Sequence, residues 1–287
     1  MDAEQAKAEQ KPRKAGFFAT VFASPPSILT LMIPGLGHLY LGRAKRGVVW
    51  FLLVEALFFA GYAILGVRLW GGGMNLGTTV WGLPLNYIPE VGNFLTTFLT
   101  LKATFPLPGA PGWMDAVGLA KLPVPWEHVG FLLTALSGLL NVFAAADAWW
   151  LARVEKTERE KDPWLSTPTG AAFLSWIVPG LGQWKLGYKS RGAVQFGSIT
   201  LLFLLGLVFS GFSAVDRSQV YFWYAGMLFD GGSTILSTLF FAPLRFHNTG
   251  STMWDLGVTT TCIAGLMNVA VFLDAYTLAE KRKEAAP

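Results

Sequence analysis

Long apolar runs alternate with short charged segments along this chain of 287 residues. A transmembrane helix needs about 20 consecutive apolar residues. Four runs reach that length, and none contains more than one charged residue: 47–67, 129–152, 192–215 and 256–279. We therefore expect an all-α integral membrane protein with four transmembrane helices.

The apolar pattern occurs twice in the chain. Residues 33–47 return in similar form at 178–192, each time with a Pro-Gly-Leu-Gly sequence near the start. A second shared stretch closes each copy, at 138–148 and at 265–275. The chain is therefore a tandem duplication, and we expect five divisions. They are a tail 1–23, a first repeat 24–152, a charged linker 153–166, a second repeat 167–280 and a tail 281–287.

Each repeat opens with a short apolar stretch before its first long run. Ser24 and Thr167 each precede a proline, which is typical of a helix N-terminus. In the first copy about nine residues, or about 13 Å of helix, precede the Pro-Gly turn, which is less than half the hydrocarbon thickness. Because basic residues flank both ends, we expect a re-entrant or interfacial half-helix at the cytoplasmic face. The alternative is a full span over 15–41, with its equivalent at 167–187.

Basic residues are unevenly distributed about the apolar runs. Most of the 22 Lys and Arg residues lie in the two tails, in the linker and just before the first and third runs. The positive-inside rule therefore predicts that both termini and the linker are cytoplasmic. With an even number of spans in each repeat, both repeats have the same orientation. We expect a pseudo-two-fold axis along the membrane normal to relate them.

Composition supports a membrane protein and argues against several other classes. The chain is 53% hydrophobic and only 14% charged, too apolar for a soluble globule of this length. Its pI of about 9.2 reflects topology, and we expect no nucleic-acid partner because the positive charge is split among short clusters. The single Cys262 permits no intrachain disulfide and no cysteine metal site. We expect no metal and no cofactor, since the usual nucleotide, zinc and nucleophile motifs do not occur.

Two segments connect the spans on the side opposite the termini, 68–128 and 216–255. Each contains an apolar stretch, at 94–98 and at 235–239, which we expect to form an interfacial helix. Tryptophan and tyrosine are frequent in both segments, as in the aromatic belts that flank a bilayer.

Small residues and one asparagine share a helical face in the second span of each repeat. Asn141 and Asn268 occupy equivalent positions among Gly and Ala residues. Small residues let helices approach closely, and a central Asn can hydrogen-bond across the contact. We interpret this face as a packing seam, and a ligand-binding role for the two Asn residues is the alternative.

The aspartate near the cytoplasmic end of each second span has two interpretations. Asp147 and Asp274 lie at the same depth as Arg46 and Arg191, which begin the neighbouring spans. An Arg–Asp pair in each repeat would neutralise both groups without chemistry. The alternative is a proton or cation relay, because carboxylates inside a membrane often mark functional sites.

Two titratable residues distinguish the first repeat from the second. Glu55 lies deeper in the first span than either aspartate, and its counterpart is Thr200. His38 follows the first Pro-Gly turn, and its counterpart is Gln183. Glu55 is either a protonated or paired carboxyl between helices, or a coupling or substrate site reached from His38.

The turns after the half-helices also have two interpretations. Glycines there let the chain reverse beside another helix. Alternatively, the carbonyl end of each half-helix favours a cation inside the membrane. The residues of these turns are Pro34, Gly35, Gly37, Gly42, Pro179, Gly180, Gly182 and Gly187.

Residues 35–42 and the Asp that closes each second span resemble the two-transmembrane-helix domain family, which has a G-x-G-x-H-x-F-Y-L-G entry motif. They are equally similar to bacterial inner-membrane proteins of unknown function that begin with P-G-x-G-H or P-G-x-G-Q. The chain departs from the first motif in the spacing between His38 and Tyr40, and from both by Gln183 and Lys185 in the second copy. The resemblance implies a hairpin module in the bacterial inner membrane and no established catalytic activity.

Three functional hypotheses follow. The leading one is a non-enzymatic scaffold or accessory subunit that packs against other membrane-protein subunits and lipids. The second is a small transporter or channel with a pathway between the repeats, using Glu55, Asp147 and Asp274. The third is an intramembrane lipid-modifying enzyme that uses His38 and Asp147. A polar cavity between the repeats would favour transport, and a dry interface would favour the scaffold.

Overall fold

The computed structural model describes residues 24–76, 87–107, 109–154, 163–244 and 252–284, and these form helices joined by turns. The helices of the first repeat are α3 (Pro25–Met32), α4 (Leu36–Tyr40), α5 (Ala44–Leu65), η1 (Gly66–Leu76), α7 (Ile88–Val91), α8 (Phe94–Thr104), α9 (Trp113–Lys121) and α10 (Glu127–Arg153). After η2 (Trp164–Ser166), the second repeat has α11 (Pro168–Ile177), α12 (Leu181–Lys185), α13 (Lys189–Phe209), η3 (Ser213–Val215), α14 (Arg217–Met227), α15 (Gly231–Phe241), η4 (Ala242–Leu244) and α16 (Thr252–Glu284).

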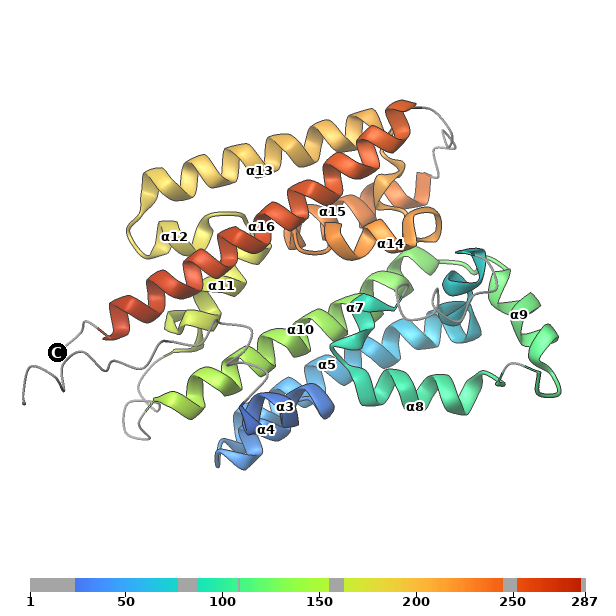
Figure 1. Ribbon diagram of the computed structural model, residues 1–287, viewed down its shortest axis with the longest axis horizontal. Coiled ribbons are helices and arrows are strands. Elements are labelled where there is room, and N and C mark those ends of the chain that lie inside the picture. The colour runs from blue at the N-terminus through green and yellow to red at the C-terminus, as the bar shows by residue number, and fades with distance from the viewer. Residues whose placement is uncertain (1–23, 77–86, 108, 155–162, 245–251, 285–287) are drawn as a thin grey trace, which may run out of the picture.

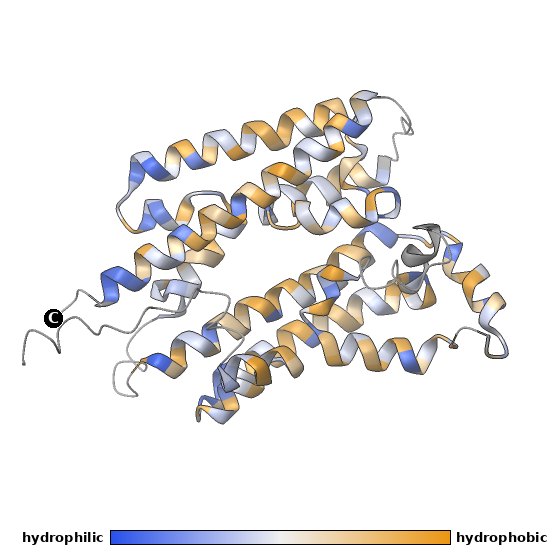
Figure 2. Ribbon diagram, in the orientation of Figure 1, coloured by the Kyte–Doolittle hydropathy of each residue, from blue (hydrophilic) through white to orange (hydrophobic). Residues whose placement is uncertain are grey.

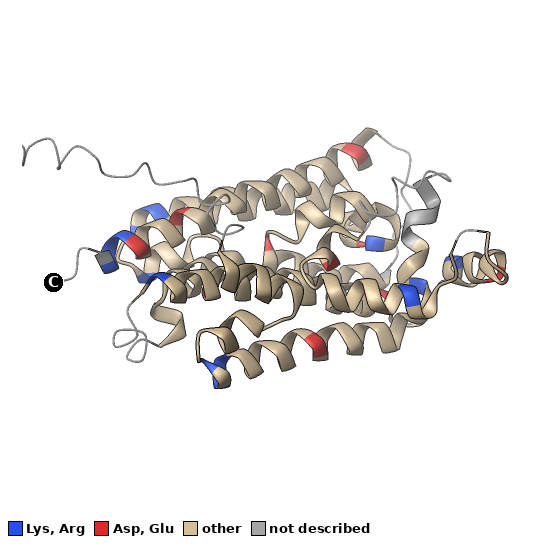
Figure 3. Cartoon of the chain, turned by 60° about the horizontal axis from the view of Figure 1, so that its bottom comes forward, with Lys and Arg blue, Asp and Glu red and all other residues tan. Residues whose placement is uncertain are grey.

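Four helices, α5, α10, α13 and α16, are long and apolar enough to cross a membrane. The predicted all-α, four-span class is therefore confirmed. Their middle portions are predominantly apolar in Figure 2, and Figure 3 shows most charged residues toward the two ends of the long helices.

The ends of two spans differ from the predicted ranges. The third was expected to reach residue 215, but α13 ends at Phe209. Gly211 and Phe212 both adopt positive φ, at 59° and 63°, and this turns the chain into η3. Helix α16 is longer than expected because it continues without a break into Lys281, Arg282 and Lys283. Apolarity alone marks neither end, since a backbone turn can occur inside an apolar run and a helix can continue into water.

The two repeats have the same orientation. In Figure 1, α5 and α13 run in one direction, and α10 and α16 return in the other. Each pair packs as an antiparallel hairpin, α5 against α10 and α13 against α16.

A short helix precedes each hairpin and folds back on it. Helix α3 has 8 residues and α11 has 10, so each is about 12–15 Å long and cannot cross the hydrocarbon alone. After α3 the chain is extended at Ile33 and then left-handed at Gly35, where φ is 76°. One continuous helix over 15–41 is therefore not formed in the described part of that range; residues 15–23 lie outside it.

The repeats meet through different faces. Helices α11, α14 and α15 of the second repeat pack against α10 of the first. Of the corresponding helices of the first repeat, α3 and α8 lie on the far side of α10 from α16 (Figure 1), whereas α7 reaches α14 through Glu90. The short helices therefore depart from the expected two-fold relation. Helices α10 and α16 agree with it in part, because they also meet through equivalent residues, Trp149 with Tyr276 and Arg153 with Glu280. Repeat sequences specify each hairpin, whereas the seam between the hairpins depends on side chains that differ between the copies.

Candidate functional site

A buried three-residue junction ties the first hairpin to its half-helix segment. Asp147 on α10 accepts a hydrogen bond from Arg46 on α5, with Nη2 and Oδ1 2.5 Å apart. Its other oxygen lies 2.9 Å from Nε2 of His38 on α4. His38 and Asp147 are fully buried, while the side chain of Arg46 is 23% exposed. The structure thus brings together three of the residues that the sequence singled out.

The second repeat has the same junction with one substitution. Asp274 on α16 pairs with Arg191 on α13, at 2.6 Å between Nη2 and Oδ1. Gln183 occupies the place of His38 and donates from Nε2 to Asp274 Oδ2 at 3.0 Å and to the Val271 carbonyl at 2.8 Å. This junction is more open, since the side chains of Arg191 and Asp274 are 52% and 23% exposed. An amide can replace the imidazole, so the contact to aspartate requires a donor and no titratable group.

Glycines allow the half-helix turns to lie directly on the spans. A Cβ atom on Gly35 would lie 2.0 Å from the Gly47 carbonyl oxygen, and one on Gly180 would lie 2.2 Å from that of Gly192. Both residues also have left-handed backbones, with φ of 76° and 80°. This close approach sets α4 and α12 beside the aspartates.

A hydroxyl closes each turn from the half-helix side. Thr30 Oγ1 accepts a hydrogen bond from the Gly37 amide at 3.1 Å and donates to the Pro26 carbonyl at 2.9 Å. In the second repeat, Ser175 Oγ accepts from the Gly182 amide at 2.9 Å and donates to Gln183 Oε1 at 2.8 Å. Each turn is therefore held by an internal hydrogen-bond network.

Asn141 and Asn268 occupy equivalent positions in the two repeats, and each ties three chain segments together. Asn141 Nδ2 donates to the Thr30 carbonyl at 2.9 Å and to the Gly92 carbonyl at 2.7 Å. Asn268 Nδ2 is 3.2 Å from the Ser175 carbonyl and 2.9 Å from the Phe229 carbonyl. These amides satisfy carbonyls near the ends of the half-helices, the groups that would bind a cation in the alternative interpretation of the turns. The geometry is that of a structural cross-link.

Glu55 lies apart from the junction. Its Oε1 accepts a hydrogen bond from Thr96 on α8 at 2.8 Å. It is nine positions beyond Arg46 on the same helix, which corresponds to about 13 Å of helical rise. The structure does not bring Glu55 and His38 together, so the combined site that was considered for these two residues is not assembled.

A buried ion pair across the seam was not anticipated from the sequence. Arg217 at the start of α14 meets Glu90 on α7 at two points, Nη1 to Oε1 at 2.5 Å and Nη2 to Oε2 at 2.9 Å. Thr134 Oγ1 also donates to Glu90, at 2.8 Å, and both charged side chains are at most 1% exposed. Burial lowers the pKa of Arg217, but the adjacent Glu90 carboxylate outweighs this and raises the pKa above its usual value. Both residues lie in connecting segments and the counterpart of Glu90 is Met227, so no repeat pattern indicated the pair.

A second buried carboxyl lies in the second repeat, outside the four spans. Asp230 precedes α15 and is fully buried. Burial raises the pKa of Asp230 to about 7, while the nearby Ser233 hydroxyl opposes part of this rise. Its counterpart in the first repeat is the buried Asn93, so the fold accommodates a neutral amide at this position.

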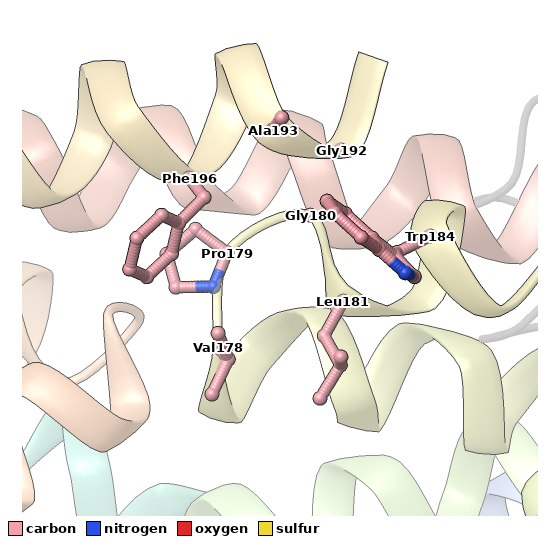
Figure 4. A pocket seen from close by; sticks show the side chains of 8 residues that line it. All are labelled: Val178, Pro179, Gly180, Leu181, Trp184, Gly192, Ala193 and Phe196. Carbon is pink, nitrogen blue, oxygen red and sulfur yellow. The ribbon is translucent and has the colours of Figure 1, made fainter. Parts of the chain in front are cut away.

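An apolar groove lies beside the second Pro-Gly turn. Figure 4 shows Pro179, Leu181, Trp184 and Phe196 around it, and Gly180 and Gly192 also line it. It encloses about 150 Å³ and has no charged residue in its lining. Within the described ranges, no group of three or more His, Cys, Asp or Glu residues is placed to hold a metal ion. The junctions therefore provide ion pairing and hydrogen bonding, and the groove provides apolar contact.

Four spanning-length helices and a polar junction in each hairpin define a multi-pass membrane protein built from two like repeats. Comparison with family models matches residues 26–161 and 170–285 to a family of unknown function, DUF6677. The match covers most of both repeats, and the chain belongs to this family. No curated protein and no solved structure matches it.

Proposed function

We propose that the protein is a non-enzymatic scaffold or accessory subunit that binds other membrane proteins. We place it in the bacterial inner membrane with both termini in the cytoplasm. The distribution of basic residues and the likeness of its turns to hairpin modules of the two-transmembrane-helix domain family support this location.

The observation that carries the proposal is the apolar packing between the repeats. Phe143 of α10 packs on Phe173 and Trp176 of α11, with ring centroids 5.6 Å and 5.5 Å away. Leu136, Met227 and further buried apolar side chains continue this cluster. A solute pathway between the repeats requires accessible polar groups or water along that surface. The buried charged groups described there, Glu90 and Arg217, are bonded to each other, so this packing supports a scaffold over a transporter.

The state of the charged residues also supports a structural role. Asp147 is bonded to both Arg46 and His38, and Glu90 is bonded at both oxygens to Arg217. A reaction at His38 and Asp147 would require substrate to enter a fully buried contact and displace an ion pair. We therefore favour a binding role over lipid-modifying catalysis.

Purification of the full chain from native membranes in a mild detergent tests the proposal. We expect defined membrane proteins to co-purify and to be identified by mass spectrometry, at constant ratio through a second size-separation step. A tagged, unrelated four-span protein at equal expression serves as control. The proposal fails if the chain purifies alone and moves a solute into vesicles, with the flux reduced in a Glu55→Gln variant.

A further inference from the structure

The contact between the repeats joins mainly two unlike faces, and most of the counterpart of each face lies outside that contact. The second repeat contributes α11, α14 and α15, and the first contributes α10. Helix α7 also reaches this contact through Glu90, and α16 touches α10 through Tyr276 and Glu280. At the equivalent place in the first repeat, α3, α7 and α8 form a face like that of α11, α14 and α15. In the second repeat, α16 forms a face like that of α10. In Figure 1, α3 and α8 lie at the lower edge of the molecule, and α16 lies on the other side of α10 from them.

The face on α16 keeps the apolar pattern of its equivalent on α10. Four residues of α10 at helical spacing are 9% exposed or less, because the second repeat covers them: Leu136, Leu139, Leu140 and Phe143. Their equivalents in α16 are Ile263, Leu266, Met267 and Ala270. The first three are each at least 45% exposed. The stripe has the same position and an apolar character in both helices, and it is covered in only one of them.

The face formed by α3, α7 and α8 is likewise exposed where its equivalent in the second repeat is covered. Phe173, Ile177, Leu228 and Ile235 of the second repeat lie in or against the core between the repeats. Their equivalents in the first repeat are Ile28, Met32, Val91 and Phe98, each at least 44% exposed. The first repeat thus presents apolar side chains where the second repeat makes its seam.

Exposure to lipid explains other apolar residues but does not account for this difference. Val49 and Val194 are equivalent and are 64% and 68% exposed, and the equivalent Phe59 and Leu204 on the same two helices are 53% and 52% exposed. These positions are open in both repeats, as expected for a surface that faces acyl chains. The stripes on α10 and α16 instead differ between repeats, and the difference follows from which one has a neighbour.

We propose that the protein assembles head to tail with copies of itself, with α16 of one copy receiving α3, α7 and α8 of the next. This rests on the proposed scaffold function and names a partner for it. A contact between unlike faces leaves one face free at each end, so such contacts build rings or open chains. Because both repeats have the same orientation, the added copy enters the same membrane with the same orientation. Close packing of side chains, which drives helix association in lipid, would form the contact.

A known contact inside the chain indicates where cross-links should form. Phe143 packs on Phe173 at a centroid distance of 5.6 Å. The equivalent pair between two copies is Ala270 and Ile28. In a Cys262→Ser background, the double variant Ala270→Cys with Ile28→Cys should form disulfide-linked dimers and higher multiples when oxidised in native membranes. Neither single variant should form the ladder, since one cysteine per chain cannot extend it.

The matched control is Leu204→Cys with Phe59→Cys, which places both cysteines on faces that are exposed in both repeats. We expect no ladder from this pair. A second measurement uses Ile263→Trp, which obstructs the α16 face without touching the internal seam, and should reduce the mass of the detergent-solubilised assembly to that of one chain. Leu204→Trp should leave the mass unchanged.

The inference is overturned if the Ala270 and Ile28 pair cross-links no more than the control pair and the wild-type mass equals one chain. If other membrane proteins still co-purify in that case, the scaffold function stands and only self-assembly is lost. If copies cross-link while the chain also carries a solute, self-assembly stands and the scaffold function is lost.

Discussion

Arg217 of the second repeat and Glu90 of the first form a two-point ion pair across the seam, at 2.5 Å and 2.9 Å. It is the deepest charged contact described between the repeats, with both side chains at most 1% exposed. The apolar counterpart of Glu90, Met227, occupies the same place in the other repeat. The pair therefore helps to fix how the two repeats are oriented relative to each other, at a seam that is held mainly by apolar packing.

Breaking this pair should destabilise the fold. Glu90→Gln leaves a buried guanidinium without its countercharge, and such losses cost about 3–5 kcal/mol. We expect a lower thermal midpoint in detergent, measured by intrinsic tryptophan fluorescence. The double variant Glu90→Met with Arg217→Leu should recover most of the loss, because a well-packed apolar pair replaces the charges. A Glu90→Gln protein as stable as wild type would show that the pair contributes nothing to the seam.

The two junction aspartates should differ in importance. Asp147→Asn removes a fully buried carboxylate that holds Arg46 and His38, and we expect a loss of about 3 kcal/mol. Asp274→Asn affects a pair whose Arg191 is half exposed, and such pairs contribute about 1 kcal/mol or less. Chemical denaturation of the two variants side by side measures the difference. Equal losses would contradict the assignment of the buried junction as the stronger one.

Stability should depend on pH through Asp230. Its folded pKa of about 7 lies above the usual carboxyl value, so the folded state holds this proton more tightly than the unfolded state does. Stability contributed by this group is full in acid, falls as pH rises from about 4 to about 7, and is constant above. Asp230→Asn should remove that fall and be more stable than wild type at pH 8. Identical pH profiles for the two proteins, from thermal melts between pH 5 and pH 8, would refute this.

Gly35 should tolerate substitution less well than Gly42. Both have left-handed backbones, with φ of 76° and 73°. A Cβ on Gly35 would also collide with the Gly47 carbonyl, whereas nothing lies within 4 Å of one on Gly42. Gly42→Ala should cost only backbone strain, about 1–2 kcal/mol, and Gly35→Ala should cost clearly more. Thermal melts of both variants test the order, and the reverse order would contradict the close approach of turn and span.

Lys45 and Lys189 should be accessible from the cytoplasm only. In a Cys262→Ser background, Lys45→Cys and Lys189→Cys should react with a membrane-impermeant maleimide in inverted vesicles and resist it in intact spheroplasts. Both positions begin a span after a half-helix that returns to its own side. Labelling of Lys45→Cys from the periplasm would mean that the segment before it crosses the membrane.

Several features were predictable because they depend on local sequence. Uncharged runs of about 20 residues indicated the spans, and the repeated Pro-Gly turns indicated where short helices end. The Arg46–Asp147 and Arg191–Asp274 contacts followed from depth, since each pair begins or ends adjoining antiparallel helices at one face. The role of His38 was less accessible, because Gln183 makes the same donor contact without a titratable group.

By itself, the sequence determined that the chain is a duplicated, four-span helical protein with an ion pair at one end of each hairpin. Only the tertiary structure decided how the hairpins meet, that Glu90 pairs with Arg217, and that Glu55 lies apart from His38. The reason is physical. Hydrophobicity and helix geometry act within a hairpin and repeat with its sequence. The seam between hairpins depends on the shapes of side chains far apart in the chain, and the two copies differ there.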